Sequence, residues 1–430
     1  MRLIHIILPV LAAGALLASC GPRPARQLLS DEALLDTVER CTIKYFTEFA
    51  DPATGLARER NNDLNGNIVT IGGSGFGMMA VIAGAEREYY PLEDGISLID
   101  KMVTSLETFE RFHGAWAHWY DADSGRTFSF SEFDDGGDLV ETAFMVQGLL
   151  TARQWLKGKD DTLSERCDKL WKDVEWDWYT QGTDSLYWHW SKNYGWKMNH
   201  RIKGYDETLI TYVLAASSPT HPIRPEVYEA CYKNSPYYYN GKEYYGIKLP
   251  LGMELGGPLF FCHYSWLGLD PRGLKDGYTD YFERNTAHTR IHREYAIDNP
   301  KGHKGLGKKL WGFTSSDDPD VGYSSHHPGT PDENGTVSPT AAISSIVYTP
   351  IESLEVMGYL FYETEMFGPY GFYDAYNAGR EPAVVDHYLA IDQGPEAVMI
   401  ENYRSGLLWK LFMSCPEIMP GLQKLGFYYE

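Results

Sequence analysis

Helical periodicity dominates the pattern of hydrophobic and polar positions along this chain. Alternating patterns typical of strands are few and short. Apolar residues recur at the spacing of helices over Asp31–Phe49, Gly75–Tyr90, Gly95–Phe112, Asp138–Lys157, Leu163–Trp176, Asp206–Ala216, Pro225–Asn234, Pro258–Leu267, Gly277–Tyr295, Pro339–Phe361 and Pro395–Met413. The pattern therefore predicts an all-α protein.

Six of these helices are apolar on nearly all sides and begin at a strong N-terminal signal. The signals are Ser74, Asp138, Asp206, Gly257-Pro258, Ser338-Pro339 and Gly394-Pro395. Helices between them are more polar, as in "DDTLSERCDKLWKDVEW". A helix that is apolar all round is buried, so the alternation predicts the inner and outer rings of an (α/α)6 barrel. An irregular helical array or an α-solenoid is the alternative.

The N-terminal segment "MRLIHIILPVLAAGALLASC" has the pattern of a secretory signal, with an arginine, an apolar core and small residues at its end. "LASC" resembles a bacterial lipobox, which predicts that Cys20 is lipidated; an ordinary cleaved signal is the alternative. We expect a signal peptide over 1–19, a lipidated tether over 20–30 and one (α/α)6 domain over 31–430. The protein would be exported and lipid-anchored, facing the periplasm or at the outer membrane. Because no acidic run follows Cys20, an anchor that faces the periplasm is favoured over display on the cell surface.

Composition limits the classes of partner. The formal net charge of −21 argues against binding to nucleic acid or to anionic lipid surfaces, so an uncharged substrate fits best. The cysteines after Cys20 form no CxxC pair, and the adjacent His326 and His327 do not easily bind one ion, so no metal or other cofactor is predicted. We expect a monomer.

Four carboxylates crowd the segment "FDDGGDLVETAF". They are Asp134, Asp135, Asp138 and Glu141. Asp138 and Glu141 have the spacing of a helix capping box, in which the first acid caps backbone N–H groups and the second reaches back. Capping leaves Asp134 and Asp135 unexplained, and the two glycines beside them allow the backbone to approach another group closely.

Acids also stand at other inner-helix starts. Asp206 and Glu207 open the third inner helix, Glu254 precedes the fourth, and Asp392 and Glu396 open the sixth. If the inner helices run parallel, their N-termini and these acids lie on one face of the barrel. Acids at four of the six starts exceed what capping requires, which favours catalysis or sugar binding for the group.

Paired carboxylates are the chemistry of glycoside cleavage, in which one acid protonates the leaving oxygen and another activates water or attacks carbon. Glu207 and Glu141 suit the proton donor. Asp135, Asp138 and Asp392 suit the base or the binding of hydroxyl groups. Simple capping is the competing interpretation of each residue.

Aromatic residues make up 14% of the chain and occur in the same loops as the acids. Their rings can stack on sugar rings, although a large core is the other use for such a composition. Trp311 lies in a stretch that reads as a loop and is expected to be a sugar platform. The expected substrate-binding residues are Asp134, Asp392, Glu254, His118, Trp119, Tyr264, Trp266, Trp311 and Tyr376.

Several blocks together resemble one known family. "TIGGSGFGMMAVIAGAERE", "HGAWAHWYDADSG", "FDDGGDLVETAFMVQGLLTAR", "GYDETLITYVLAASSPTHPI" and "GPYGFYDAYN" are similar to the bacterial glycoamylase, or glucoamylase-like, domain, which includes β-1,2-glucan-degrading glycoside hydrolases. The resemblance runs from about residue 34 to about residue 412. It implies a single (α/α)6 barrel that hydrolyses a glucan or gluco-oligosaccharide without a metal and with inversion.

The resemblance implies an acidic patch at Asp134, Asp135, Asp138 and Glu141, and a second key acid at Glu207. The favoured substrate is β-1,2-glucan or its oligosaccharides. An α-glucan exo-hydrolase is the second enzyme hypothesis, because the fold does not determine which glycosidic linkage is cleaved. A third is a glycan-binding lipoprotein without catalysis, whose acids would be too dispersed to flank one glycosidic bond.

Overall fold

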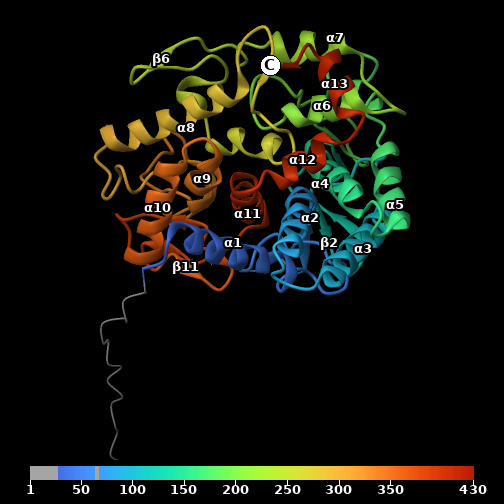
Figure 1. The fold of residues 1–430 in the computed structure, drawn as a ribbon. Coiled ribbons are helices and arrows are strands. Elements are labelled where there is room, and N and C mark those ends of the chain that lie inside the picture. The colour runs from blue at the N-terminus through green and yellow to red at the C-terminus, as the bar shows by residue number, and fades with distance from the viewer. Residues whose placement is uncertain (1–27, 63–66) are drawn as a thin grey trace, which may run out of the picture.

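The computed structural model describes residues 28–62 and 67–430. In this part of the chain, inner elements alternate in sequence with outer helices (Figure 1). Inner helices such as α2 and α4 are buried on nearly all sides, whereas outer helices such as α3 and α5 are only partly buried. The inner elements are α2 (Ile71–Glu86), α4 (Leu139–Leu156), α6 (Leu209–Ser217), the 3₁₀ turns η4 (Leu259–Cys262) and η5 (Tyr264–Trp266), α9 (Pro339–Ile343) with η6 (Ser344–Val347), and α11 (Ala390–Arg404). The outer elements are α1 (Asp31–Thr47), α3 (Leu92–Thr108), α5 (Asp161–Lys172), α7 (Pro225–Val227) with the π-helix η2 (Tyr228–Lys233), α8 (Tyr281–Asp298) and α10 (Pro350–Glu363).

The inner elements close into a ring. α2 contacts α4 and α11, α4 contacts α6, α6 contacts η5, and α11 contacts α9 and η6. Side chains join the remaining neighbours: His263 Nε2 lies 3.0 Å from Ser345 Oγ, and the Tyr348 hydroxyl donates to the Cys262 carbonyl at 2.8 Å. A closed ring confirms the predicted (α/α)6 arrangement and excludes the open α-solenoid.

Glycine residues allow the neighbouring inner helices α2 and α4 to pack with their backbones close together. A Cβ on Gly75 would lie 2.4 Å from the Phe144 carbonyl oxygen, and a Cβ on Gly148 would lie 2.3 Å from the Gly75 carbonyl oxygen. Only glycine allows backbones this near to each other. Nearly every residue of both helices is buried, as their all-round apolar pattern requires.

Three predicted inner helices begin elsewhere than expected. α2 begins at Ile71, so Ser74 lies inside the helix, where its hydroxyl donates to the Thr70 carbonyl. α11 begins at Ala390 rather than at Gly394-Pro395, because the Ala390 N–H pairs with the Glu59 carbonyl and fixes the helix start there. α6 likewise starts at Leu209 after Thr208, not at Asp206.

Three predicted helices differ in form from the expectation: two are each divided into separate elements, and one is formed by 3₁₀ turns. Pro350 lacks an N–H and disfavours helix at Thr349, so the stretch predicted as Pro339–Phe361 becomes one inner element and the outer helix α10. Gly406, at φ 67°, separates α11 from α12 (Leu407–Met413). The fourth inner element is formed by 3₁₀ turns instead of an α-helix.

The described strands are two to four residues long and pair only antiparallel. They are β1 (Ile68–Thr70), β2 (Trp119–Asp121), β3 (Arg126–Phe128), β4 (Gly137–Asp138), β5 (His189–Trp190), β6 (Glu243–Tyr244), β7 (Ile247–Lys248), β8 (Leu274–Lys275), β9 (Ser315–Asp318), β10 (Gly322–Ser325), β11 (Phe367–Gly368), β12 (Gly371–Phe372), β13 (Ala375–Tyr376), β14 (Val384–Val385) and β15 (Tyr428–Tyr429). Several of them brace the loops that enter the inner helices, so they position side chains rather than build a core.

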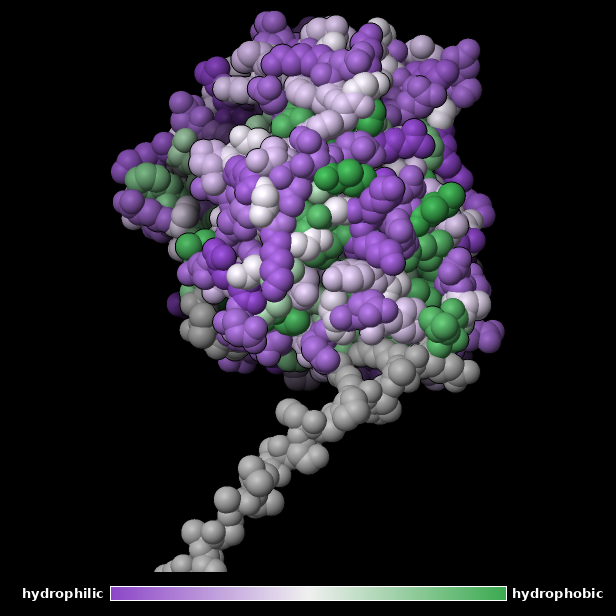
Figure 2. Space-filling model, turned by 90° about the vertical axis from the view of Figure 1, so that its left-hand side faces the viewer, coloured by the Kyte–Doolittle hydropathy of each residue, from purple (hydrophilic) through white to green (hydrophobic). Residues whose placement is uncertain are grey.

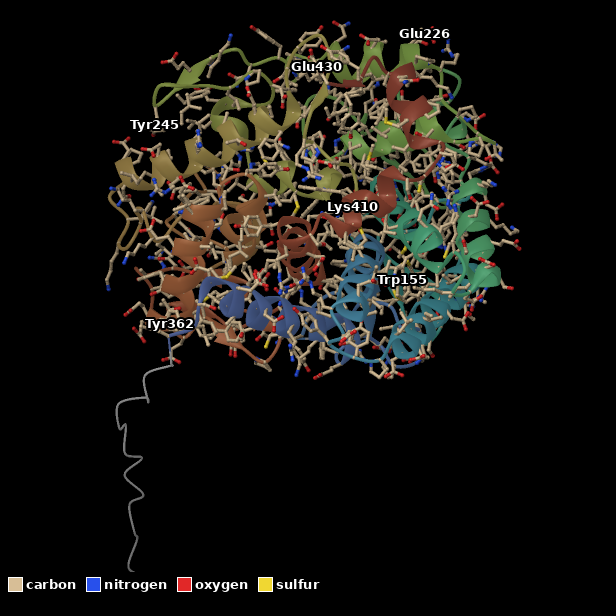
Figure 3. The ribbon with its side chains drawn as sticks, viewed as in Figure 1. Trp155, Glu226, Tyr245, Tyr362, Lys410 and Glu430 are labelled. Carbon is tan, nitrogen blue, oxygen red and sulfur yellow. The ribbon has the colours of Figure 1, made fainter. Side chains whose placement is uncertain are left out.

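The chain ends against the outer surface of the ring. α13 (Ile418–Lys424) packs on α6, and β15 pairs with β8. Before α1, the Leu29 N–H donates to the Tyr362 hydroxyl, so the chain enters the barrel beside α10, where Figure 3 labels Tyr362. On the face that Figure 2 draws, hydrophilic residues cover most of the surface and hydrophobic ones form small separate groups.

The predicted signal peptide over 1–19 and the lipidation of Cys20 lie outside the described residues and stay predictions. Within the described residues, none of the helices combines the length and the hydrophobicity that crossing a membrane requires.

Candidate active site

A cavity of about 300 Å³ opens where the inner elements begin. Five of the six inner elements contribute residues at or near their N-terminal ends. The lining residues are Glu59, Arg60, Thr70, His118, Trp119, Phe130, Glu141, Phe144, Trp188, Glu207, Phe260, Tyr264, Tyr323, Leu389 and Ile391. The predicted gathering of inner-helix N-termini around one hollow is therefore present, with α9 as the element that contributes no lining residue.

Asp138 is the N-cap of α4. Its Oδ1 accepts from the Val140 and Glu141 N–H groups, both at 2.9 Å, and its Oδ2 accepts from Trp188 Nε1 at 3.1 Å. Burial raises the pKa of Asp138, but the hydrogen bond and charge of His118 and the capped N–H groups outweigh burial, so the pKa is lowered. Asp138 is thus a fixed anion, and the capping half of the sequence prediction is confirmed.

Glu141 does not complete the predicted capping box. The Asp138 N–H donates instead to the Trp116 carbonyl, and Glu141 Oε2 accepts from the Gly72 N–H in the first turn of α2 at 2.7 Å. Burial raises the pKa of Glu141 to about 7, with the Asp138 charge adding to the rise and His118 opposing it. Glu141 departs from the predicted capping box because of tertiary packing: α2 lies close enough for the Gly72 N–H to donate to its carboxylate.

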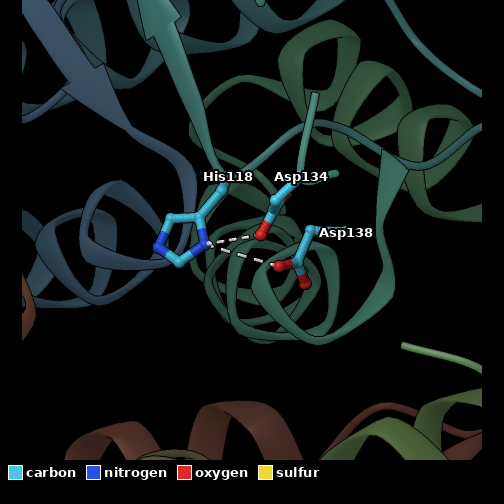
Figure 4. A group of neighbouring side chains, drawn as sticks. All are labelled: His118, Asp134 and Asp138. Carbon is cyan, nitrogen blue, oxygen red and sulfur yellow. Dashed lines mark ion pairs between the residues drawn. The ribbon is translucent and has the colours of Figure 1, made fainter. Parts of the chain in front are cut away.

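His118 lies among three carboxylates. Nδ1 is 3.5 Å from Asp138 Oδ2 and 3.9 Å from Asp134 Oδ2 (Figure 4), and Nε2 is 3.8 Å from Glu141 Oε1. Burial lowers the pKa of His118, but the charges of Glu141, Asp138 and Asp134 outweigh it and raise the pKa to about 9. At neutral pH the ring is an imidazolium that partly neutralises the acidic patch. Its face stacks on Phe130 with the centroids 4.2 Å apart.

Among the described residues, His118, Asp134 and Asp138 offer ligand atoms within 4.8 Å of one another, close enough to hold a metal ion. Burial and the Asp138 charge raise the pKa of Asp134 to about 7. The three-residue group therefore holds more negative than positive charge when its carboxyl groups are ionised. The protonated imidazole already supplies one cation to the group. We therefore interpret it as an imidazolium–carboxylate cluster.

Short strands hold this patch in register. β2 pairs with β1, which leads into α2, so His118 and Trp119 are fixed beside the start of that helix. β4 pairs with β5 and aligns Asp138 with His189. A Cβ on Gly136 would lie 2.2 Å from the Trp190 carbonyl oxygen, so the glycines of "FDDGGD" allow the close approach that the sequence predicts.

Glu207 projects from the turn before α6 and lines the cavity. Ser265 fixes its backbone, accepting from the Ile210 N–H at 3.0 Å and donating to the Glu207 carbonyl oxygen. Burial and the charge of Asp206 raise the pKa of Glu207 well above its usual range. Among the described residues, no cation pairs with its carboxyl group, so Glu207 holds a proton and directs it at the cavity.

A second acidic cluster lies behind the opposite wall. Arg60 lines the cavity and binds both Asp317 carboxylate oxygens, at 3.0 and 2.9 Å. His387 Nδ1 lies 2.7 Å from Asp317 Oδ2, and the Asp317 N–H donates to Asp374 Oδ2 at 2.6 Å. Burial raises the pKa of Asp392, and the neighbouring Asp374 raises it further. Asp392 also acts electrostatically on the wall residues Tyr264 and Tyr323.

The structure separates the predicted site residues into two groups. Glu207, Glu141, His118, Trp119 and Tyr264 line the cavity, and Asp134, Asp138 and Asp392 are buried directly behind its walls. The others are placed elsewhere: Asp135, Glu254, Trp266, Trp311 and Tyr376 do not line the cavity.

Burial explains most of these corrections. Trp311 is 1% exposed and Trp266 is fully buried, so neither ring has a free face for a sugar, and both belong to the core. Glu254 is exposed and lies 3.8 Å from Lys242 at the surface. Asp135 accepts from Asn193 Nδ2 at 2.5 Å in the loop behind the patch. Tyr376 pairs with Val384 between β13 and β14.

Sequence reasoning missed part of the second wall. Glu59, Arg60 and Tyr323 line the cavity, and Asp317 and Asp374 lie behind it. None of them stands at the start of an inner helix marked by a capping residue or a proline, so the pattern of helix starts does not point to them. The run "SSDD" at 315–318 is a strand with every residue buried, and such a buried acidic strand is the one local sign of this wall.

Replacing Gly72 by alanine should damage the site without unfolding the protein. The new Cβ would lie 2.4 Å from Glu141 Oε2, so the Glu141 carboxylate must move off the Gly72 N–H. We expect the kcat/KM of catalysis at this site to fall about tenfold, as for loss of one charge-assisted hydrogen bond of about 1.5 kcal/mol. Gly358→Ala on α10 is the control, because nothing lies within 4 Å of its Cβ. Equal activity of the two variants would contradict this role of Gly72.

Comparison with known proteins finds relatives that are similar in sequence and in structure. The profile of the Glycoamylase family, described as "putative glucoamylase", matches residues 199–416. The crystal structure of a "putative glucoamylase" from Bacteroides uniformis superposes with a TM-score of 0.91 at 51% identity, covering 94% of this chain and 99% of that one. The chain belongs to the Glycoamylase family.

Two relatives of this Glycoamylase-family chain have named activities. An endo-β-1,2-glucanase from Chitinophaga pinensis, in complex with sophorotriose and glucose, is 49% identical with a TM-score of 0.90, covering 93% of this chain and 99% of that one. An exo β-1,2-glucooligosaccharide sophorohydrolase from Parabacteroides distasonis is 42% identical over 422 residues. That alignment covers 92% of this chain but only 58% of the relative.

Proposed function

We propose that this protein is a glycoside hydrolase that cleaves β-1,2-glucan or its gluco-oligosaccharides by an inverting mechanism. The observation that carries the proposal is the cavity itself, which Glu207 lines with a carboxyl group of raised pKa and behind whose wall Asp138 is held as an anion. Two relatives with more than 40% identity to this chain are named for β-1,2-linked substrates. Hydrolysis of a glycosidic bond needs a proton donor and a water-activating base, and the cavity offers both.

Glu207 is the proton donor in this proposal. A general acid must hold its proton at the working pH and give it to the leaving oxygen in the transition state. Burial and the adjacent Asp206 keep Glu207 protonated, and within residues 28–62 and 67–430 no ion pair holds its carboxyl group. Glu141, the other predicted donor, is held by the Gly72 N–H and lies near the His118 imidazolium, so it is better suited to binding a sugar hydroxyl group.

The acidic wall at Asp392 is assigned to water activation. Asp138 is ionised, but both of its oxygens are already engaged by the α4 N-terminus, by Trp188 and by His118. Asp135 Oδ2 accepts from Asn193 Nδ2 in the loop behind the acidic patch, and neither Asp135 nor Asp392 lines the cavity itself. Asp392 Oδ2 is buried without a hydrogen-bond partner among the described residues, beside the wall tyrosines. Asp135 Oδ1 is also buried without a partner among the described residues, so Asp392 is preferred for its position: it follows the wall residue Ile391 and acts electrostatically on the wall residues Tyr264 and Tyr323.

Aromatic side chains on both walls suit a chain of glucose units. Trp119, Phe130, Trp188 and Phe260 line the cavity together with Tyr264 and Tyr323. Aromatic rings stack on the apolar faces of pyranose rings, while carboxylates accept hydrogen bonds from the hydroxyl groups. The cavity thus combines the two kinds of contact that an uncharged sugar requires.

A linkage panel tests the proposed function. The purified protein would be incubated with β-1,2-glucan, sophoro-oligosaccharides, laminarin, cellulose oligomers and starch, and the products separated by chromatography. We expect release of short β-1,2-linked products only. Glucose released from starch would instead identify an α-glucan exo-hydrolase. Binding of sophoro-oligosaccharides without turnover would identify a glycan-binding protein, and both outcomes contradict the proposal.

A further inference from the structure

Two buried carboxyl groups behind the second wall lack donors. Asp374 Oδ1 and Asp392 Oδ2 are each buried and have no hydrogen-bond partner among the described residues. A buried carboxylate oxygen without a donor has lost its hydration with no hydrogen bond in exchange, which is unfavourable. The two carboxyl groups lie within hydrogen-bonding reach of one another, so a single proton placed between them satisfies both.

The backbone holds this pair together. Asp374 lies between β12 and β13, and its carbonyl accepts from the hydroxyl of Ser338, the N-cap residue of α9, at 2.6 Å. Asp392 lies in the first turn of α11, and its carbonyl accepts from the Thr340 hydroxyl at 2.8 Å. The pair is therefore fixed between two neighbouring inner helices, beside the cavity wall.

Charges around the pair oppose a second negative charge. Asp317 is ionised and holds Arg60 and His387, so these two cations are already committed. The titratable or charged groups that interact with the pair are Asp317, Arg60, His387, Glu396, Tyr45, Tyr264 and Tyr323. Like charges at a buried site raise one pKa of the pair strongly, as in other carboxylate dyads.

We propose that Asp374 is a positioning residue that shares one proton with Asp392, so that the two act as a dyad with a single negative charge. This inference rests on the proposed hydrolysis. As water attacks the anomeric carbon, one water O–H bond breaks and its proton passes to the dyad. The glycosidic C–O bond breaks, and the leaving oxygen takes the Glu207 proton. The dyad then returns its proton to solvent, and Glu207 takes one up, so the balance is one water consumed per bond cleaved.

Asp374→Asn tests the shared proton. The asparagine amide keeps the shape of the side chain, can still accept from the Asp317 N–H and donates a fixed hydrogen bond to Asp392, so the pKa of Asp392 falls. We expect the acidic limb of the kcat/KM profile to move down by about one pH unit or more, with KM little changed.

Asp392→Asn should lower kcat by about 10²-fold at every pH. Asp276→Asn, at a buried aspartate bound by Tyr238 and Tyr281 outside the cavity, is the matched control.

Infrared difference spectra provide a readout that does not need activity. At neutral pH the wild type should show the carbonyl band of a protonated carboxyl group that both Asp374→Asn and Asp392→Asn remove and Asp276→Asn retains. A parallel loss of activity at all pH values in Asp374→Asn, or an unchanged band, would overturn the dyad. If the wild type cleaves none of the glucans, the proposed function fails, while the band still decides whether the proton is shared.

Discussion

Glu207→Gln should abolish hydrolysis while leaving the fold intact. The glutamine keeps the size of the side chain but cannot give a proton to the leaving oxygen, so we expect kcat on sophoro-oligosaccharides to fall about 10³-fold with KM little changed. The fold should tolerate the change, because Glu207 pairs with no cation among the described residues and is already protonated by burial and the Asp206 charge. Initial rates and thermal unfolding of the same preparations measure the two effects.

The leaving group provides the sharper measurement for Glu207. A nitrophenyl sophoroside releases a phenolate that needs no proton, so Glu207→Gln should lose far less activity on it than on the natural oligosaccharide. Glu254→Gln is the matched control, since Glu254 is exposed and pairs with Lys242 outside the cavity. Equal losses on both substrates would show that Glu207 is not the proton donor.

His118→Gln should remove a large part of the protein's stability near neutral pH. The folded pKa of His118 is raised to about 9 by the three surrounding carboxylates, against 6.5 for a free histidine. A difference of 2.5 pKa units corresponds to about 3 kcal/mol of unfolding free energy. This contribution is fully present below pH 6.5 and is lost as the pH rises through about 9.

The pH dependence is the measurement for His118. Denaturant unfolding of the wild type and His118→Gln should differ by about 3 kcal/mol near pH 6.5, and the difference should shrink above about pH 9. His221→Gln is the control, because His221 pairs with Asp177 at the surface and its loss should change little. A constant difference between pH 6.5 and 10 would mean that packing on Phe130, rather than charge, is what the variant loses.

The helical pattern of the sequence was sufficient for the architecture. Capping residues and prolines beside apolar stretches marked all six inner elements, because burial on every side leaves an apolar sequence with no polar face. The marks were less reliable for the helix starts. At α2 and α11, backbone pairing with neighbouring segments placed the first turn several residues earlier than the local signal.

The same distinction applies to the site. Acids at helix starts pointed to Asp138, Glu141, Glu207 and Asp392, and all four lie in or directly behind the walls of the cavity. Local sequence does not distinguish an exposed aromatic residue from a buried one, so it predicts sugar contacts for Trp311 and Trp266, which are both buried. It also could not reveal Arg60 or Asp374, because neither residue lies in a marked helix.

The sequence by itself determined which helices are buried and that acidic residues collect at their leading ends, since both follow from local periodicity and capping. Tertiary structure alone decided the protonation of those acids. The pKa of each carboxyl group depends on its distance from residues far away in the chain: Gly72 for Glu141, His118 for Asp138, and Asp374 for Asp392. Charge interactions act through space, and no spacing along the chain records them.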